Sequence, residues 1–403
     1  MFGMHVQRLL VRLIGALGAL VLGLAGWLSG VTWLDVQPVS QPPPWAAVDA
    51  NGRLVLYVQG QAQPLPGVGG VTVGSLPVLA PDGRRVALIC EDAGVVVVRV
   101  VAIADGTAID VYRDTGHVPQ GVQWSPDGQY LAFRVDGGME TVVAVADGSR
   151  PAQTVARGAP AFFDWHPDSG HLLIHAGGEG RNGGVVALYT LATEQTTILH
   201  TDSGPFQAPQ WNAVGDGYFY VRDPQSTVDR ELAAPRAQVV EQYRDGRVTL
   251  IADEGDADIR LFANPVSADV AYIVATADSQ RLVWWDGGAR HVLSEEIPLL
   301  AFWAPDGRAL AALVPVDMTQ LQWVRIGAVT QQSERSAPFV PSPLFARVVQ
   351  AGDVTTYTPW SADAQWLLTS AEGRVMGIRV HGAPEVVSLG DGEFGMWLTA
   401  VEE

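Results

Sequence analysis

Residues 124–133 read WSPDGQYLAF, and the same ten-position pattern returns along most of the chain. Clear copies begin at Trp165, Leu79 and Trp303, and weaker copies begin at Trp211, Ala263 and Trp360. Successive copies start 40 to 57 residues apart. A period of this length is typical of stacked supersecondary units rather than of one mixed core. The sequence therefore predicts a repeat protein.

Each unit reads as four short strands joined by tight turns. In the clearest unit the expected strands are 121–124, 130–135, 141–146 and 153–156, with turns at 126–128 and 147–148. Proline presets a turn dihedral, aspartate bonds back to the backbone and glycine takes a positive φ, so we interpret Asp127 as a structural turn residue. Strands rich in Val, Ile, Leu and Tyr indicate an all-β protein. We expect no helix of convincing length after residue 45.

A four-stranded sheet with a large anchor residue, repeated around a ring, is typical of a β-propeller, whose closure removes exposed sheet edges. Residues 124–133 closely resemble the hallmark of the TolB-like, WD-repeat-like propeller family, in which Trp-Ser-Pro-Asp-Gly precedes an apolar strand. The resemblance covers about residues 46–403. It implies a fold of seven or eight four-stranded blades, and little about function, because the repeats of this family serve many roles.

The number of blades follows from the two ends of the repeat region. Trp397 resembles one more anchor, yet the chain stops at Glu403, before its partner strands. The strands Arg53–Val58 and Gln61–Pro66 precede the first anchor and lack an entering strand of their own. We therefore expect N- and C-terminal strands to complete one mixed blade, which favours eight blades. Seven remains the alternative if the terminal hairpin is only an extra edge.

The N-terminal region predicts a membrane anchor. Residues 13–34 carry no charge, and as a helix they would reach about 33 Å, enough for a hydrocarbon core of roughly 30 Å. Arg8 and Arg12 place residues 1–12 in the cytoplasm, so the rest is expected to be extracytoplasmic in a single-pass protein of the cell membrane. Residues 35–45 read as a Pro-rich linker, and 46–403 as the propeller. The alternative is a signal peptide cleaved near Gly23–Ala25.

Composition excludes several classes of function. The net charge of −18 argues against nucleic-acid binding, because a polyanion would be repelled. All 25 basic residues are arginine, which excludes Schiff-base and general-base chemistry by lysine. The single cysteine, Cys90, forbids an internal disulfide and is interpreted as a small buried residue.

The short turns should fall on one face of the ring and the insertions on the other. The largest insertions are 223–236 and the Pro-rich segment 336–353. Long loops on a rigid scaffold usually carry binding, although neutral decoration is the competing interpretation. We predict that the first insertion binds the partner through five residues: Asp223, Asp229, Arg230, Glu231 and Arg236.

Three patterns invite a cofactor or metal interpretation, and none is adopted. His166, His171 and His175 crowd one unit, but they align with positions that vary between units, so we interpret them as surface or strand-face residues. Asp253–Asp258 lacks the spacing of a calcium-binding EF-hand loop and is expected to be a solvated acidic loop. Gly178–Gly183 matches Gly-x-Gly-x-x-Gly but has no following helix, so it reads as a hairpin loop.

Catalytic motifs do not appear in the sequence. It contains no Gly-x-Ser-x-Gly elbow, no His-Glu-x-x-His and no sialidase-type box. A site of Arg, Asp and Glu contributed by separate blades to the central funnel stays open, because such residues have no fixed spacing. We predict a non-catalytic binding or scaffolding module of the cell envelope, whose partner is another envelope protein, a peptide or a glycan. The alternative is a funnel-site hydrolase or lyase acting on an envelope glycan or peptide.

Overall fold

The computed structural model describes residues 42–398 with short gaps. The gaps are residues 59–60, 66–67, 69–71, 74–75, 136–138, 159–160, 178–183, 205–207, 225–235, 297, 352–356 and 381–384. The membrane span predicted at 13–34 and the loop predicted at 178–183 lie outside the described residues. Within the described residues, no helix combines the length and the apolar character needed to cross a membrane. Residues 43–403 form one compact unit.

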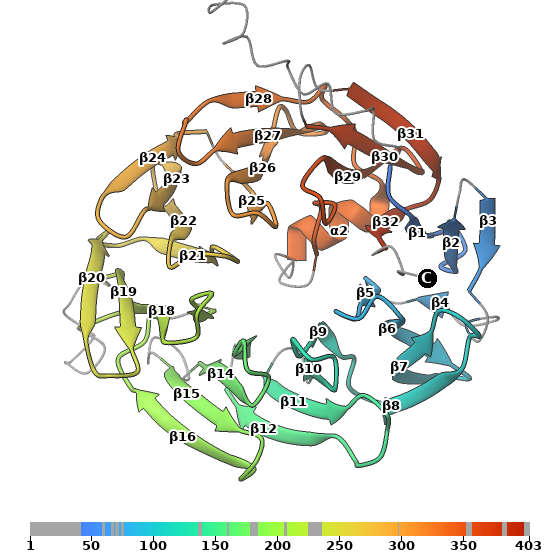
Figure 1. Cartoon of the computed structure of the whole chain (residues 1–403), viewed down its shortest axis with the longest axis horizontal. Helices are drawn as coiled ribbons and strands as arrows, with labels where there is room; N and C mark the ends of the chain where they lie inside the picture. Colours follow the sequence, from blue (N-terminus) through green and yellow to red (C-terminus); the bar gives the residue numbers. More distant parts are fainter. Residues whose placement is uncertain are drawn as a thin grey trace, which may run out of the picture. The chain divides into compact units, whose positions relative to one another are not determined.

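Eight antiparallel sheets are arranged as blades around a ring (Figure 1). Blade 1 contains β32 (Phe394–Trp397), β1 (Trp45–Val48), β2 (Leu54–Val58) and β3 (Gln61–Pro64). Blade 2 contains β4 (Thr72–Val73) and β5 (Val78–Leu79), both paired with β6 (Arg85–Asp92), and then β7 (Val95–Ala102) and β8 (Ala108–Asp114). Blade 3 contains β9 (Gln120–Trp124), β10 (Tyr130–Val135), β11 (Glu140–Val145) and β12 (Gln153–Arg157). Blade 4 contains β13 (Ala161–Trp165), β14 (His171–Ala176), β15 (Val185–Thr190) and β16 (Gln195–His200).

The second half of the ring repeats this plan. Blade 5 contains β17 (Gln210–Trp211), β18 (Gly217–Arg222), β19 (Gln238–Tyr243) and β20 (Val248–Asp253). Blade 6 contains β21 (Asp258–Ala263), β22 (Val270–Ala275), β23 (Gln280–Trp285) and β24 (Arg290–Ser294). Blade 7 contains β25 (Leu300–Trp303), β26 (Ala309–Pro315), β27 (Leu321–Gly327) and β28 (Ser333–Arg335). Blade 8 contains β29 (Trp366–Ala371), β30 (Arg374–Arg379) and β31 (Glu385–Asp391), with Trp360 bridged to Leu367 as its inner edge.

The mixed blade at the ends of the chain confirms eight blades rather than seven. Inner strand β32 comes from the C-terminus and pairs with β1, so that Trp45 lies opposite Trp397 and Val48 opposite Phe394. The Leu398 N–H also donates to the Pro44 carbonyl at 2.8 Å. The hydrogen bonds of one sheet therefore close the ring, and blade 1 cannot form without both ends of the repeat region.

In five blades the anchor tryptophan bonds its blade to the preceding one. Each indole N–H donates to the carbonyl of the residue just before the anchor position of the previous blade. The pairs are Trp124 to Val78 at 3.0 Å, Trp165 to Gln123 at 3.3 Å, Trp303 to Phe262 at 2.8 Å, Trp360 to Phe302 at 3.0 Å and Trp397 to Pro359 at 2.8 Å. Tryptophan thus supplies both a large buried ring and a donor directed at the neighbouring blade.

The two faces of the ring differ as expected. The Pro-Asp-Gly and Asp-Gly turns join first to second and third to fourth strands, so they share one face, called here the turn face. Asp223 follows β18 and Arg236 precedes β19, so the described ends of the 223–236 insertion lie on the opposite face, called here the loop face. The chain enters blade 1 at Trp45 on the turn face, because Trp45 pairs with the end of β32.

One expectation about the second insertion is wrong, because it contains a helix. α2 (Pro343–Ala351) begins at a proline, which is tolerated at the first helical position. It lies inside the ring in Figure 1, near β25 and β32. Phe345 is buried against Phe339, Tyr357 and Phe394. The helix is therefore fixed by tertiary aromatic packing, which a reading of local pattern does not see.

The acidic loop after β20 is also not fully solvated. The side chain of Glu254 is only 5% exposed, and its carboxylate forms ion pairs with Arg281 and Arg290. Tyr272 also donates to it at 3.4 Å. The arginines come from blade 6, so Glu254 joins the end of blade 5 to the next blade.

Candidate functional site between blades 3 and 4

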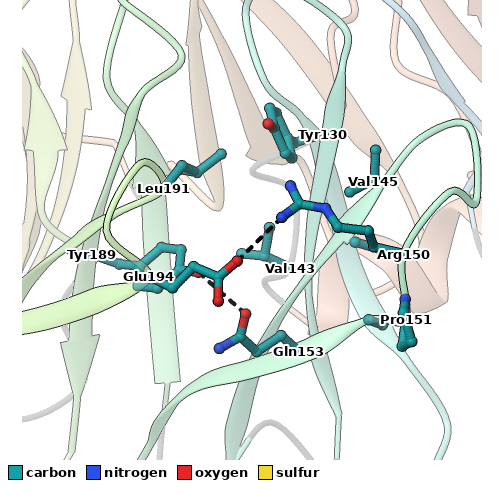
Figure 2. Close-up of a pocket in the computed structure, with 11 residues that line it drawn as sticks. Tyr130, Val143, Val145, Arg150, Pro151, Gln153, Tyr189, Leu191 and Glu194 are labelled. Atoms are coloured by element: carbon teal, nitrogen blue, oxygen red, sulfur yellow. Dashed lines mark hydrogen bonds and ion pairs between the residues drawn. The ribbon is translucent and has the colours of Figure 1, made fainter.

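A pocket of about 360 Å³ lies between blades 3 and 4 on the turn face. Figure 2 shows residues of both blades around it: Tyr130, Val143, Val145 and Arg150 from blade 3, and Tyr189, Leu191 and Glu194 from blade 4. The volume falls in the range of small-ligand sites, which are mostly apolar with a few placed polar groups. This inter-blade pocket is the candidate functional site.

The walls of the pocket follow from strand alternation. Val143 and Val145 are two residues apart on β11, so their side chains leave the same side of the sheet and face blade 4. Tyr189 on β15 packs in the same apolar cluster as Val143, with Trp165 below. Tyr130 starts β10 and its ring centroid lies 6.4 Å from that of Trp165. The apolar part of the wall therefore comes mainly from strands, whereas Arg150, Leu191 and Glu194 come from the turns after β11 and β15.

An ion pair crosses the pocket between the two blades. The Arg150 guanidinium lies 3.1 Å from the Glu194 carboxylate, with 57% and 52% of their side chains exposed. An exposed pair of this kind contributes about 1 kcal/mol or less, so a ligand can displace one member at little cost. Beside it the Tyr189 hydroxyl donates to the Gln153 side chain at 3.5 Å. These groups form a polar rim over an apolar floor.

The chemistry of the lining residues suits binding better than catalysis. Burial raises the pKa of Tyr189, and the negative charge of Glu194 raises it further, so this tyrosine keeps its proton at neutral pH. The ionisable groups of the lining are two tyrosines, one arginine and one glutamate. General acid–base catalysis needs two ionisable groups beside the same reacting atom, with their pKa values shifted in opposite directions.

Of the partner residues predicted from sequence, the structure describes Asp223 and Arg236, and both lie on the loop face. Asp223 is buried, and its N–H donates to the Asp202 carbonyl at 2.8 Å. Arg236 forms an ion pair with Asp253 at 2.7 Å, which holds the Asp253 pKa low, at about 2. Asp229, Arg230 and Glu231 lie outside the described residues. The structure does not bring these residues together with the inter-blade pocket, and the binding role of the loop stays a prediction.

Sequence reasoning missed the residues of the inter-blade pocket. Tyr130 belongs to the repeat itself and was assigned no role of its own, while Arg150 follows an ordinary Asp-Gly turn. The pocket forms because the turn after β11 and the turn after β15 stand side by side. One sequence signal could have indicated the pocket. Charged residues of opposite sign, Arg150 and Glu194, stand at the turns of two successive units.

A second polar feature runs along the innermost strands. Asp164 accepts the Trp211 N–H at 2.8 Å, and Gln210 in turn accepts the Ala263 N–H at 2.5 Å. Burial among protein atoms raises the pKa of Asp164 to about 7, although hydrogen bonds from Trp211 and Gln123 oppose the rise. Asp164 is therefore a carboxyl group that changes charge near neutral pH, with one oxygen engaged by the next blade.

The three histidines of blade 4 do not form one group. His175 is fully buried, and its Nε2 lies 3.1 Å from the Gly204 carbonyl. His166 is also buried, whereas His171 is only partly so. His171 and His175 both lie on strand β14, as expected for surface or strand-face residues, whereas His166 is buried at the turn and departs from that expectation. His166 and His171 instead meet Asp168, at the turn between β13 and β14.

No protein-family model matches the sequence, and no curated protein is significantly similar to it. Solved structures are similar in fold. Prolyl oligopeptidase B from Galerina marginata is 13% identical with a TM-score of 0.52, over 79% of this chain and 50% of the enzyme. Oligogalacturonate lyase from Vibrio parahaemolyticus is 11% identical with a TM-score of 0.49, over 87% and 85%. TolB from Acinetobacter baumannii is 13% identical with a TM-score of 0.41, over 77% and 82%. At these identities the likeness concerns the fold alone.

Proposed function

We propose that the protein is a non-catalytic binding module of the cell envelope, held at the membrane by residues 13–34, and that the inter-blade pocket takes part of a partner. The observation that carries this proposal is the combination of a rigid apolar floor with an exchangeable ion pair, Arg150–Glu194, at its rim. Such a site recognises a group by shape and charge, and it holds no nucleophile.

The pocket suits a peptide segment of another envelope protein. Its floor is built from valine, leucine and tyrosine side chains, which match an aliphatic or aromatic side chain. Arg150 can exchange Glu194 for a carboxylate of the segment, while Gln153 offers an amide to its backbone. A glycan could stack on the tyrosines, but the branched aliphatic side chains of the floor offer it no hydrogen bonds.

Site-specific photo-crosslinking in intact cells tests this function. A photoreactive residue replaces Leu191 in the pocket or, as a control, Leu250 on the exposed outer strand of blade 5. We expect a crosslinked envelope polypeptide from position 191 and none from position 250. In the 191 background, Arg150→Glu should lower the yield about tenfold, as for a loss of about 1.4 kcal/mol.

The matched control is Arg157→Glu, because Arg157 is an exposed arginine of the same blade that also pairs with a glutamate. It should leave the yield unchanged. Equal yields from positions 191 and 250, or equal effects of the two arginine variants, would contradict the proposal. The partner released from the protein should keep its mass, since the proposed module does not cleave it.

The loop between β18 and β19 is proposed as a further partner contact on the loop face, through Asp223, Arg236 and the intervening residues. A pull-down from the membrane fraction with residues 223–236 deleted tests it. Lower recovery of the partner is expected, and unchanged recovery would remove the loop from the proposal.

One observation supports the alternative of a funnel-site hydrolase or lyase. A carboxyl group with a pKa near 7, such as Asp164, suits a general acid. Its oxygen, however, already accepts the Trp211 N–H, which favours a structural role. Asp164→Asn should therefore leave partner recovery unchanged. If the unaltered protein chemically converts the partner and Asp164→Asn abolishes that conversion, the alternative is established.

A further inference from the structure

Glu194, at the rim of the inter-blade pocket, has a backbone conformation that disfavours a side chain. Its φ is +53°, in the left-handed region that residues with a Cβ adopt only at a cost in free energy. It lies in the turn between the third and fourth strands of blade 4. The corresponding turns of blades 2, 3, 5 and 6 place glycine in this region: Gly106, Gly148, Gly246 and Gly287. Blade 4 therefore has a glutamate where four other blades have the residue that fits without strain.

The ion pair of Glu194 does not offset this strain. The carboxylate reaches Arg150 on the preceding blade at 3.1 Å, but both side chains are more than half exposed. Exposed ion pairs add little to stability. Figure 2 shows the pair among the residues that line the pocket, with Arg150 coming from blade 3 and Glu194 from blade 4. A strained residue at the rim of a cavity indicates a constraint set by binding rather than by folding.

The turn of blade 7 provides a comparison, because it also has a left-handed residue other than glycine. Gln331 has a φ of +55°, and its amide lies 3.2 Å from Nδ1 of His291 on blade 6. His291 already pairs with Asp286 of its own blade at 2.9 Å. Arg150, in contrast, has no ion pair besides that with Glu194 among the described residues. The link between blades 6 and 7 is therefore structural, whereas the other link occupies a cation that has no second acidic partner.

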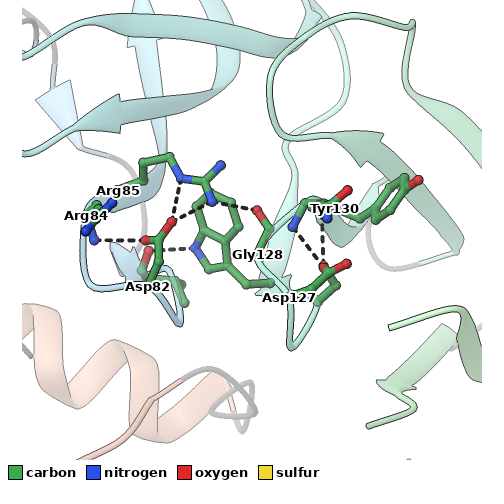
Figure 3. Close-up of polar contacts among 10 residues, drawn as sticks. Asp82, Arg84, Arg85, Asp127, Gly128 and Tyr130 are labelled. Carbon is green, nitrogen blue, oxygen red and sulfur yellow. Dashed lines mark hydrogen bonds and ion pairs between the residues drawn. The ribbon is translucent and has the colours of Figure 1, made fainter. Parts of the chain in front are cut away.

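Arg150 is also held more loosely than an arginine with a structural role on the same face. Arg85 donates to the Asp82 carboxylate and to the Gly128 carbonyl, each at 2.8 Å (Figure 3). Its guanidinium lies 5.0 Å from the ring centroid of Trp124. Only 28% of the Arg85 side chain is exposed, against 57% for Arg150. A ligand that takes Arg150 therefore has to displace a single carboxylate.

The pocket places this cation beside a small apolar floor. Arg150 and Val143 line the same cavity of about 360 Å³, which is near the lower limit for small-ligand sites. The last residue of a polypeptide carries its carboxylate and its side chain on one Cα, so it can meet both features at once. An internal Asp or Glu uses its side chain on the cation, and a second residue then has to fill the floor. The small volume therefore favours a terminal residue.

We propose that Glu194 occupies the place of a partner's C-terminal carboxylate, and that the pocket receives the last residue of a partner polypeptide. The α-carboxylate binds the Arg150 guanidinium, and an aliphatic or aromatic side chain lies on the floor around Val143. This inference rests on the proposed binding function of the pocket and adds the class of ligand. Glu194 competes with that ligand, so a segment without both features does not open the pair.

Fluorescence polarisation with purified full-length protein in detergent tests the proposal. The probe is the labelled peptide Ser-Gly-Ser-Gly-Ser-Leu with a free C-terminus. The comparison peptides are its C-terminal amide and the reordered acid Ser-Gly-Ser-Leu-Ser-Gly. We expect the probe to bind at least about tenfold more tightly than either, because the first lacks the charge and the second the terminal apolar side chain. Glu194→Gly should tighten binding of the probe about two- to fivefold, since it removes the competing exposed ion pair.

The matched control is Gln331→Gly, which makes the same kind of change at the corresponding turn of blade 7. It should leave the affinity for the probe unchanged. Absence of binding, equal binding of the acid and its amide, or equal effects of the two glycine variants would overturn the proposal. Weaker binding by Glu194→Gly would overturn it too, because a competitor cannot assist the ligand that it excludes.

Mapping the partner residue that a photoreactive group at position 191 captures separates this inference from the proposed function. Capture of the last residues of the partner supports both. Capture of an internal segment leaves the binding function in place and refutes the terminal ligand. If position 191 captures nothing, the binding function itself fails, and this inference fails with it.

Discussion

At the scale of single residues, the anchor tryptophans show how one side chain orders neighbouring blades. Their rings are buried, and in five blades the indole N–H also bonds the previous blade. The sequence predicted large packing residues at these positions. It could not predict the hydrogen bond, because the acceptor is a backbone carbonyl that lies 38 to 58 residues earlier in the chain.

Replacing two of these tryptophans separates the hydrogen bond from the packing. Trp303 donates to Phe262 at 2.8 Å, whereas Nε1 of Trp211 has no acceptor among the described residues. Both substitutions to phenylalanine remove similar ring volume. Trp303→Phe should therefore lower the free energy of unfolding by about 1–2 kcal/mol more than Trp211→Phe, measured by denaturant titration. Equal losses would show that the indole bond contributes nothing.

Asp164 gives a pH dependence of known sign. Its pKa of about 7 in the folded protein exceeds the unfolded value of roughly 4, so its contribution to stability is present below pH 4 and is lost as the pH rises to 7. Asp164→Asn removes this loss and keeps an acceptor for the Trp211 N–H. The stability of the variant relative to the unaltered protein should grow from pH 4 until the pH is about one unit above 7, reach at most about 4 kcal/mol because the two pKa values differ by about 3, and stay constant above. A difference independent of pH would refute the assignment.

At the scale of elements, the strands were largely predictable and the sites between them were not. The predicted strand 130–135 coincides with β10, because a short apolar run after a Pro-Asp-Gly turn is a local signal. Helix α2 was missed, since its burial depends on Phe339 and Phe394 from distant segments. Glu254 was expected in water, because its arginine partners lie on the next blade. The inter-blade pocket exists only where two turns meet.

Strand β32 offers the most direct test at this scale. It buries Phe394, Met396 and Trp397 in blade 1. Deleting residues 394–403 should remove more than about 5 kcal/mol, a large share of the stability of a typical protein, and abolish the cooperative thermal transition. Deleting only 399–403 keeps every described bond of β32 and should leave Tm unchanged. A stable ring after the longer deletion would show that the first blade closes without the C-terminus.

At the scale of the whole molecule, eight similar blades provide a rigid ring whose differences lie at junctions and in loops. The repeat accounts for the turns and anchors that every blade needs. We propose that a partner is recognised by features that only some blades carry, such as the Arg150–Glu194 pair. Because the net charge is −18, we expect this recognition not to involve nucleic acids.

The central claim is that a partner binds in the inter-blade pocket. A structure of the protein with its crosslinked partner tests it most directly. The account predicts a side chain of the partner between Tyr130 and Tyr189, with Arg150 released from Glu194. A partner seated only on the loop of residues 223–236, or held beside Asp164 on the innermost strands with the pocket unchanged, would contradict it.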